Sequence, residues 1–440
     1  MKRMITTAGL VALGAASVAP SFAQTTMQNQ KPWSVGALLR GFYDDNYFMY
    51  PDAPAAGLEP EGSFGFDVAP NASLSLVRDQ TSIDLSYMYQ LRYFIDRPTP
   101  RDDHSHLANA KLTHVFNEQY SVDVRNSFAI AQEPSVIDDD GPLSTPLRSE
   151  GDNIRNAGGI AFNGRLGERF RLTLGYDNTF YDYEEDADDI DRARGTPVGF
   201  SSRSSVLDRM EHLAEVRGGF ELNPRTTLGA SYKYRRVEFS SDDPVLVGFA
   251  GPIPLTLPGK AFDRESHIGT LTAELRLNAQ LSLDGEVGVE YTTYENALFD
   301  EEVGPFAALR GTWQYARGSG LNVGVRHGRQ TTDVRTQFNA TTGVGRPLAD
   351  AEATTVWVSV NHAITAKLSA IAMAQFQHNV YDGGGDDSVE DIFYGGITLA
   401  YEINQHVSAE VGYSYDRLES DSDLRTFDRN RVFAGVRFRY

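Results

Sequence analysis

Apolar and polar residues alternate with a period of two along almost the whole chain. In Leu281-Ser-Leu-Asp-Gly-Glu-Val-Gly-Val-Glu-Tyr291 the odd positions are apolar, aromatic or Gly, and the even positions are mostly polar. Residues 83–93 and 407–415 follow the same rule. Because successive strand side chains point to opposite faces, each such strand has one apolar and one polar face. The predicted strands, at roughly ten to thirteen residues, exceed the five or six usual in soluble sheets and suit a tilted membrane strand.

Short turns and long loops alternate between these strands. The long segments, such as 133–153, 184–205, 240–265 and 332–350, are rich in Asp, Gly, Pro and Ser. Eight short turns, each joining two alternating runs, are predicted at residues 78–80, 117–118, 166–168, 223–224, 278–279, 317–319, 365–366 and 404–405. Eight hairpins and the two outer runs, 34–44 and 431–440, predict about 18 strands, with both termini on the side of the short turns.

Proline placement agrees with this map, because Pro cannot donate to a strand ladder and is expected outside strand interiors. Nearly all of the 19 Pro residues fall in predicted loops, turns or the N-terminal region. Pro70 is the exception, and we predict a bulge or the upper end of the second strand there. A propeller would divide each repeat into four short strands, whereas each repeat here provides two long ones.

These features predict an all-β fold: a transmembrane antiparallel up-and-down β-barrel with short periplasmic turns and long extracellular loops. A barrel closes because every backbone polar group needs a partner where no water is available. No run of about 18 apolar residues follows residue 24, so a membrane-spanning helix is not expected. Aromatic residues near strand ends are expected to form two interfacial belts, with ordinary strand propensity as the alternative reading: Tyr176, Tyr291, Tyr413 and Tyr415 near the loops, and Tyr120, Phe170 and Phe220 near the turns.

The N-terminus indicates export. Lys2 and Arg3 precede an apolar stretch, and small residues surround Phe22, so residues 1–23 are predicted to be a Sec-type signal peptide. Residues 24–32 would be a periplasmic lead, and residues 33–440 the barrel. The chain has no Cys, which excludes disulfides, thiolate metal sites and a lipoprotein anchor. A net charge of −20 argues against nucleic acid as a partner.

The last run, Val432-Phe-Ala-Gly-Val-Arg-Phe-Arg-Tyr440, looks like the C-terminal strand signal that outer-membrane proteins present to the barrel assembly machinery. Together with Trp33-Ser-Val-Gly, Gly41-Phe-Tyr-Asp-Asp-Asn46 and repeated Leu-Gly-Tyr or Val-Gly-Tyr strands, it makes the chain resemble the "putative beta-barrel porin type 2" family over most of residues 33–440. The resemblance implies an outer-membrane barrel in a Gram-negative-type bacterium, surrounded by outer-membrane lipid, and says little about activity.

In such a barrel, the function is expected to depend on the side chains that line the lumen. A barrel of this size leaves an aqueous channel, and a wall of nearly balanced charge favours small polar solutes without strong charge selection. Mutual pairing of these charges for structural reasons alone is the competing reading. Alternation predicts the following pore-lining residues: Arg40, Asp84, Arg92, Lys111, Asp123, Arg125, Arg171, Asp177, Glu215, Arg217, Lys233, Arg235, Glu274, Arg276, Asp284, Glu286, Glu290, Arg310, Arg326, Glu402, Glu410 and Arg437.

One loop, residues 245–258, is too apolar to lie comfortably in water. We expect it to fold inward and narrow the pore through Phe249, Pro252, Pro254 and Leu257, with an outward partner-binding tip as the alternative. Acidic loops, including Asp382-Gly-Gly-Gly-Asp-Asp387, show no ordered spacing of ligands, so no metal site and no cofactor are predicted.

Two functions remain. The first is a porin, as a monomer or homo-oligomer, that lets small hydrophilic solutes diffuse passively. The second is a surface-assembly or export component that binds an exported polysaccharide or protein. An enzyme is not expected, because the nine His are scattered and no HExxH, GxSxG or phosphate loop occurs.

Overall fold

The computed structural model describes residues 31–52, 59–132, 137–138, 141–142, 152–186, 201–250, 253–338, 345–381, 388–421 and 425–440. The predicted signal peptide, 1–23, and residues 24–30 of the predicted lead lie outside these ranges.

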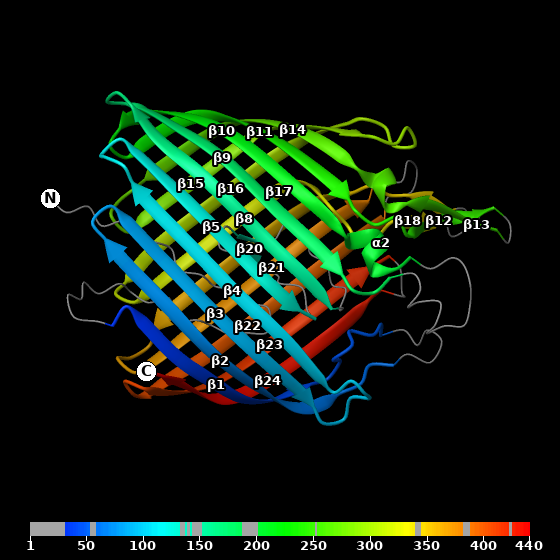
Figure 1. Ribbon diagram of the computed structural model, residues 1–440, viewed down its shortest axis with the longest axis horizontal. Coiled ribbons are helices and arrows are strands. Elements are labelled where there is room, and N and C mark those ends of the chain that lie inside the picture. Colours follow the sequence, from blue (N-terminus) through cyan, green and yellow to red (C-terminus); the bar gives the residue numbers. More distant parts are fainter. Residues whose placement is uncertain are drawn as a thin grey trace.

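Eighteen antiparallel strands form one sheet that closes on itself, as the alternation predicted (Figure 1). Closure occurs between the first and last strands, which pair from Asp44 opposite Arg431 to Gly36 opposite Arg439. The barrel strands are β1 (Trp33–Asp44), β2 (Ser63–Arg78), β3 (Thr81–Phe94), β4 (Asp102–Val115), β5 (Tyr120–Ala131), β8 (Asn153–Leu166), β9 (Phe170–Tyr183), β10 (Arg209–Asn223), β11 (Thr226–Phe239), β14 (Arg264–Arg276), β15 (Leu281–Tyr294), β16 (Glu302–Ala316), β17 (Ser319–Gln330), β20 (Ala351–Ala363), β21 (Leu368–Tyr381), β22 (Ser388–Asn404), β23 (Val407–Ser420) and β24 (Phe427–Arg439).

All eight predicted short turns connect neighbouring strands at one end of the barrel, which we call the turn end. Local chemistry explains them. Asn278 Oδ1 accepts hydrogen bonds from the backbone N–H groups of Gln280 and Leu281. Asn404 Oδ1 accepts in the same way from His406 and Val407. Gly318 has a φ of 73°, which side chains disfavour. The polypeptide reverses sharply at each of these places.

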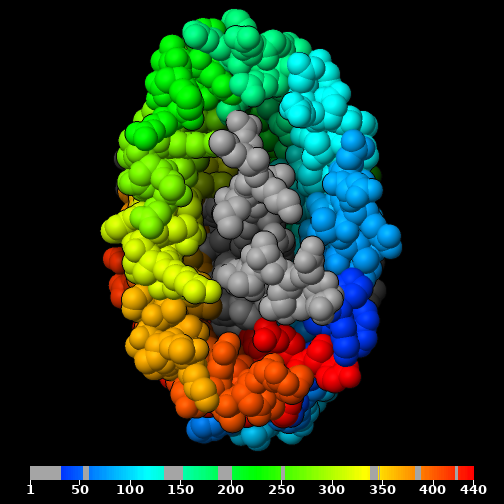
Figure 2. Space-filling view, turned by 90° about the vertical axis from the view of Figure 1, so that its left-hand side faces the viewer, coloured from blue at the N-terminus to red at the C-terminus, as the bar shows by residue number. Residues whose placement is uncertain are grey.

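Both ends of the described chain lie at the turn end, as the even strand count predicted (Figure 1). Val35 and Tyr440 exchange backbone hydrogen bonds, and the rings of Trp33 and Tyr440 are 6.1 Å apart. Figure 2 looks at this end and shows the strands as an oval ring that runs in sequence order.

Pro70 corrects one prediction. It lies inside β2, not at its end, and faces Ala37 of β1. Pairing with β3 stops after Val68 opposite Leu91 and resumes at Asn71 opposite Met88 in the same register, so there is a gap in the ladder and no bulge. A missing N–H interrupts the hydrogen bonds locally without shifting the strand, because β1 holds its other edge.

The long connections lie at the opposite end, the loop end, and carry short elements of their own. These are β6 (Ile137–Asp138), β7 (Gly141–Pro142), α2 (Arg203–Leu207), β12 (Pro244–Ala250), β13 (Ile253–Pro258), η1 (Gly259–Phe262), β18 (Thr336–Phe338) and β19 (Gly345–Pro347). Among the described residues, no helix has the length and apolar character needed to cross a bilayer.

The two faces of the wall differ as the alternation requires. Leu271 and Val287 point outward with 70% and 62% of their surfaces exposed. Glu290 and Arg209 point inward and are buried. A continuous apolar outer surface is stable in lipid and unfavourable in water, so this wall is built to be surrounded by a membrane.

Candidate functional site: the lumen and its two ends

Opposite charges pair along the inner wall. Most of the residues predicted to line the pore are held this way, with partners on the same or nearby strands. Their contacts are Arg40–Glu410 (2.6 Å), Arg92–Asp67 (3.0 Å), Arg125–Asp177 (2.9 Å), Arg171–Glu274 (3.4 Å), Arg217–Glu215 (2.9 Å), Lys233–Glu286 (2.5 Å), Arg235–Glu290 (3.2 Å) and Arg437–Glu410 (3.0 Å). Structural pairing, the competing reading, therefore describes much of the wall, and it leaves the lumen nearly neutral.

The other predicted lumen residues differ in their contacts. Asp84 accepts a hydrogen bond from Ser75, and Asp123 accepts from Thr113 and Asn163. The remaining side chains form no hydrogen bond or ion pair with another described residue, and they are Lys111, Arg276, Asp284, Arg310, Arg326 and Glu402. Their role in lining a pore stays a prediction.

An apolar cluster joins the loop-end connections to the inner wall. It combines Val206 and Leu207 of α2 and Phe262 of η1 with Phe239 of β11 and Tyr183 of β9. We call this the loop-end cluster. The sequence pattern did not predict it, because α2 and η1 are too short to show a periodic signal. Burying these side chains holds two long loops against the inside of the barrel.

Aspartates anchor both loops beside this cluster. Asp208 follows α2 and accepts a hydrogen bond from the backbone N–H of Tyr183 (2.7 Å), while Asp263 follows η1 and accepts from Phe239 (2.7 Å). Burial raises the pKa of Asp208 to about 7 and that of Asp263 to about 6, although each backbone donor opposes the shift.

A segment of the 331–350 connection crosses the loop end. On one side, the guanidinium group of Arg335 donates to the carbonyl oxygens of Val206 (2.9 Å) and Ala349 (2.8 Å). On the other side, Asp333 pairs with Arg425 (3.1 Å), which in turn pairs with Glu390 of β22 (2.5 Å). We call residues 331–335 the crossing segment.

The crossing segment links distant parts of the ring. Its contacts at the loop-end cluster involve β9 and β11, whereas Glu390 belongs to β22, and β14, β15, β16, β17, β20 and β21 stand between β11 and β22. Buried ion pairs lie beside the crossing segment. Asp350 pairs with Arg264 (3.0 Å) and Arg329 (2.7 Å) and accepts a hydrogen bond from the hydroxyl of Tyr294 (2.9 Å). Sequence reasoning missed this segment because a loop without alternation carries no signal of its path.

The apolar loop expected to narrow the pore is a hairpin, β12–β13. Its base packs into the loop-end cluster through Val245, and its far end extends away from the barrel (Figure 1). Of the expected constriction residues, Pro254 and Leu257 lie on β13. Pro252, and the side chain of Phe249, lie outside the described residues. A constriction made by this loop stays a prediction.

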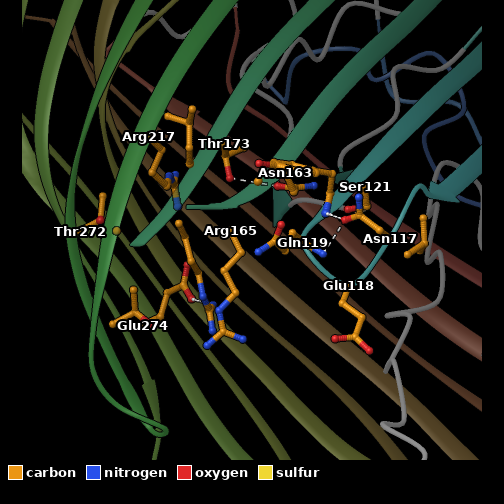
Figure 3. A pocket seen from close by; sticks show the side chains of 17 residues that line it. Asn117, Glu118, Gln119, Ser121, Asn163, Arg165, Thr173, Arg217, Thr272 and Glu274 are labelled. Atoms are coloured by element: carbon orange, nitrogen blue, oxygen red, sulfur yellow. Dashed lines mark hydrogen bonds and ion pairs between the residues drawn. The ribbon is translucent and has the colours of Figure 1, made fainter. Parts of the chain in front are cut away.

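A polar pocket opens at the turn end, with a volume of about 400 Å³. Arg217, Thr272 and Glu274 lie on one side of it, and Asn163, Ser121 and Asn117 lie on the other (Figure 3). Arg171, Arg217 and Glu274 were predicted from the alternation, while the hydroxyl and amide side chains were not singled out. Ser121, Asn163, Thr173 and Thr272 occupy inward, polar positions of their strands, so the alternation could have identified them.

Histidines lie mainly on the outer face, away from the lumen. Tyr176 bonds His212 and Tyr232 bonds His267, in both cases across neighbouring strands. Among the residues that the structure describes, no group of three or more His, Asp or Glu side chains is arranged to hold a metal ion.

The family model described as "Putative beta-barrel porin 2" matches residues 116–440. The chain belongs to this porin family. Family and fold together place the protein in the outer membrane of a Gram-negative-type bacterium and identify it as a porin-like channel.

Solved structures match the chain at low sequence identity. A BenF-like porin from Pseudomonas fluorescens Pf-5 is 11% identical, with 93% of this chain and 99% of that chain covered and a TM-score of 0.44. OccAB4 from Acinetobacter baumannii is 10% identical, with 93% and 99% covered and a TM-score of 0.42. No curated protein matches the chain. At this level of similarity, nothing about solutes or partners transfers to this chain.

Proposed function

We propose that this porin lets small hydrophilic solutes diffuse passively across the outer membrane, with little selection by charge. The observation that carries the proposal is the inner wall, on which cations and carboxylates pair while apolar side chains face outward. A wall of matched charges attracts water and polar solutes but presents no strong field of either sign. The export alternative is not favoured by the family match.

Liposome swelling tests this proposal. Purified protein in liposomes should admit small neutral sugars at rates that fall as sugar size rises, because larger solutes enter a water-filled lumen less readily. Cations and anions of equal size should permeate within about an order of magnitude of each other. Swelling that requires an added polysaccharide or protein partner would instead support the export component.

Export and assembly follow from the same proposal. Residues 1–23 would direct Sec-type export, and the last strand would be read by the barrel assembly machinery. Removing residues 438–440 should reduce the amount of heat-modifiable barrel in the outer-membrane fraction, while an equal truncation within the 24–32 lead should not. Equal amounts of folded barrel would contradict this role of the last strand. We further propose that no cofactor is needed and that catalysis is absent.

The oligomeric state is also open to measurement. A homo-oligomer in the membrane would bring outer faces together, and cross-linking of the protein in native membranes would detect it. Monomer bands alone at all cross-linker concentrations would contradict a homo-oligomer.

A further inference from the structure

The pocket at the turn end combines hydroxyl, amide and charged side chains. It contains hydroxyl groups from four strands, supplied by Ser121, Thr173, Thr227 and Thr272, together with guanidinium and carboxylate groups. Thr173 is engaged with Asn163 (3.0 Å). The hydroxyl of Thr272, by contrast, makes no hydrogen bond with another described residue. The pocket has a volume of about 400 Å³, which lies within the range of small-molecule sites.

Charges in the pocket are matched. Arg171 binds Glu221 (2.5 Å) and Glu274 (3.4 Å), and Arg165 binds Glu221 as well (3.1 Å). Arg217 binds Glu215 (2.9 Å) and Glu286 (3.5 Å). An anionic solute would have to displace one of these carboxylates, and a cationic solute would have to displace a guanidinium group.

A neutral solute with several hydroxyl groups meets no such competition. Each hydroxyl both donates and accepts a hydrogen bond, so it can bond to the carboxylates, the guanidinium groups and the threonine hydroxyls at once. We propose that this pocket is a binding subsite for small neutral polyhydroxylated solutes, such as monosaccharides. This inference rests on the proposed passage of small hydrophilic solutes and adds the class of solute.

Space for the solute comes from a glycine. Gly219 lies at an inward position of β10 and lines the pocket. A Cβ atom there would meet Thr227 Cγ2 at 3.0 Å, so a larger side chain would fill the pocket. Its neighbour Gly218 points outward, and a Cβ atom there would meet nothing within 4 Å. The pair offers a matched control, because the same substitution enters the pocket at one position and the lipid at the next.

Single-channel recording with glucose as the probe tests the subsite. In the wild-type protein and in Gly218→Leu, glucose added on the turn side should cause saturable, concentration-dependent current fluctuations. In Gly219→Leu, the channel should still conduct, but the fluctuations should require at least tenfold more glucose. Thr272→Val removes one hydroxyl without adding bulk and guards against misfolding of the Gly219 variant. It should weaken glucose binding about fivefold, which corresponds to one hydrogen bond of about 1 kcal/mol.

The outcomes separate the two proposals. Channels that conduct but show equal glucose fluctuations in all four proteins, or none in any, would overturn the subsite and leave passive diffusion standing. Saturable block by succinate in place of glucose would overturn the neutral class of solute. Absence of any conductance would overturn the proposed function together with the subsite.

Discussion

The two ends of the lumen are built from the same alternating strands but are stabilised differently. At the loop end, apolar side chains and fully buried ions hold connecting segments across the barrel, as at Asp350, of which only 2% of the side chain is exposed. At the turn end, the ion pairs are wet: the side chains of Arg171 and Glu274 are 40% and 39% exposed. The same kinds of residue therefore hold connecting segments in place at one end and leave an accessible polar surface at the other.

Equivalent substitutions at the two ends test this contrast most strongly. Asp350→Asn removes the acidic partner of the buried Arg264 and one of the two acidic partners of Arg329, which keeps Glu302, and should cost about 3–5 kcal/mol. Glu274→Gln breaks an exposed pair and should cost about 0–1 kcal/mol. Unfolding in detergent, followed by loss of heat-modifiable mobility, measures both. Equal losses of stability would remove the distinction between the two ends.

Releasing the crossing segment should have the next largest effect. Arg335→Ala removes two hydrogen bonds from a charged donor, each worth about 1.5–3 kcal/mol, and contacts with the rings of Phe239 and Phe262. We expect a larger and noisier single-channel conductance. Arg417→Ala serves as the control, because Arg417 pairs with the exposed Glu419. An Arg335→Ala conductance indistinguishable from that of the control would show that residues 331–335 do not limit flow.

Low pH should stabilise the folded loop end, with a smaller effect than the two substitutions above. Because burial raises the pKa of Asp208 to about 7 and that of Asp263 to about 6, the folded loops bind protons that an unfolded chain would release. Their contribution to stability is complete below about pH 4 and is lost as pH rises through 6 to 7. The backbone amides of Tyr183 and Phe239 should therefore exchange hydrogen faster at pH 8 than at pH 5 after correction for intrinsic rates.

The change in protection should be at most about tenfold per pH unit within that window, since one proton is involved at each site. Asp208→Asn retains an acceptor for Tyr183 and should make that amide insensitive to pH. Protection that varies equally in the variant would assign the effect to other groups.

The parts of the molecule that could be predicted from the sequence are those determined by local sequence pattern. Strands such as 281–294 and turns such as that at Asn278 follow from alternation and from side chains that bond their own backbone, so they were predicted correctly. Ion pairs such as Arg40 with Glu410 could not be predicted from local pattern, because β24 lies between their strands and only closure of the barrel brings the two side chains together. The sequence predicts which face such residues occupy but not their partners.

The loop end was least predictable for the same reason. Residues 331–335 have no periodicity, and their path depends on contacts with Val206 and Arg425, which lie far away in the sequence. At Pro70 the prediction failed to a smaller extent. The interior of β2 tolerates a residue without a backbone N–H, because the opposite edge of β2 is paired with β1.

Conductance across a planar lipid bilayer tests the central claim most directly. If the chain is a lipid-embedded ring around a water-filled lumen, the purified protein should add discrete current steps of uniform size that increase in proportion to salt concentration. A protein that inserts as a folded, heat-modifiable barrel but produces no steps at any voltage would contradict it.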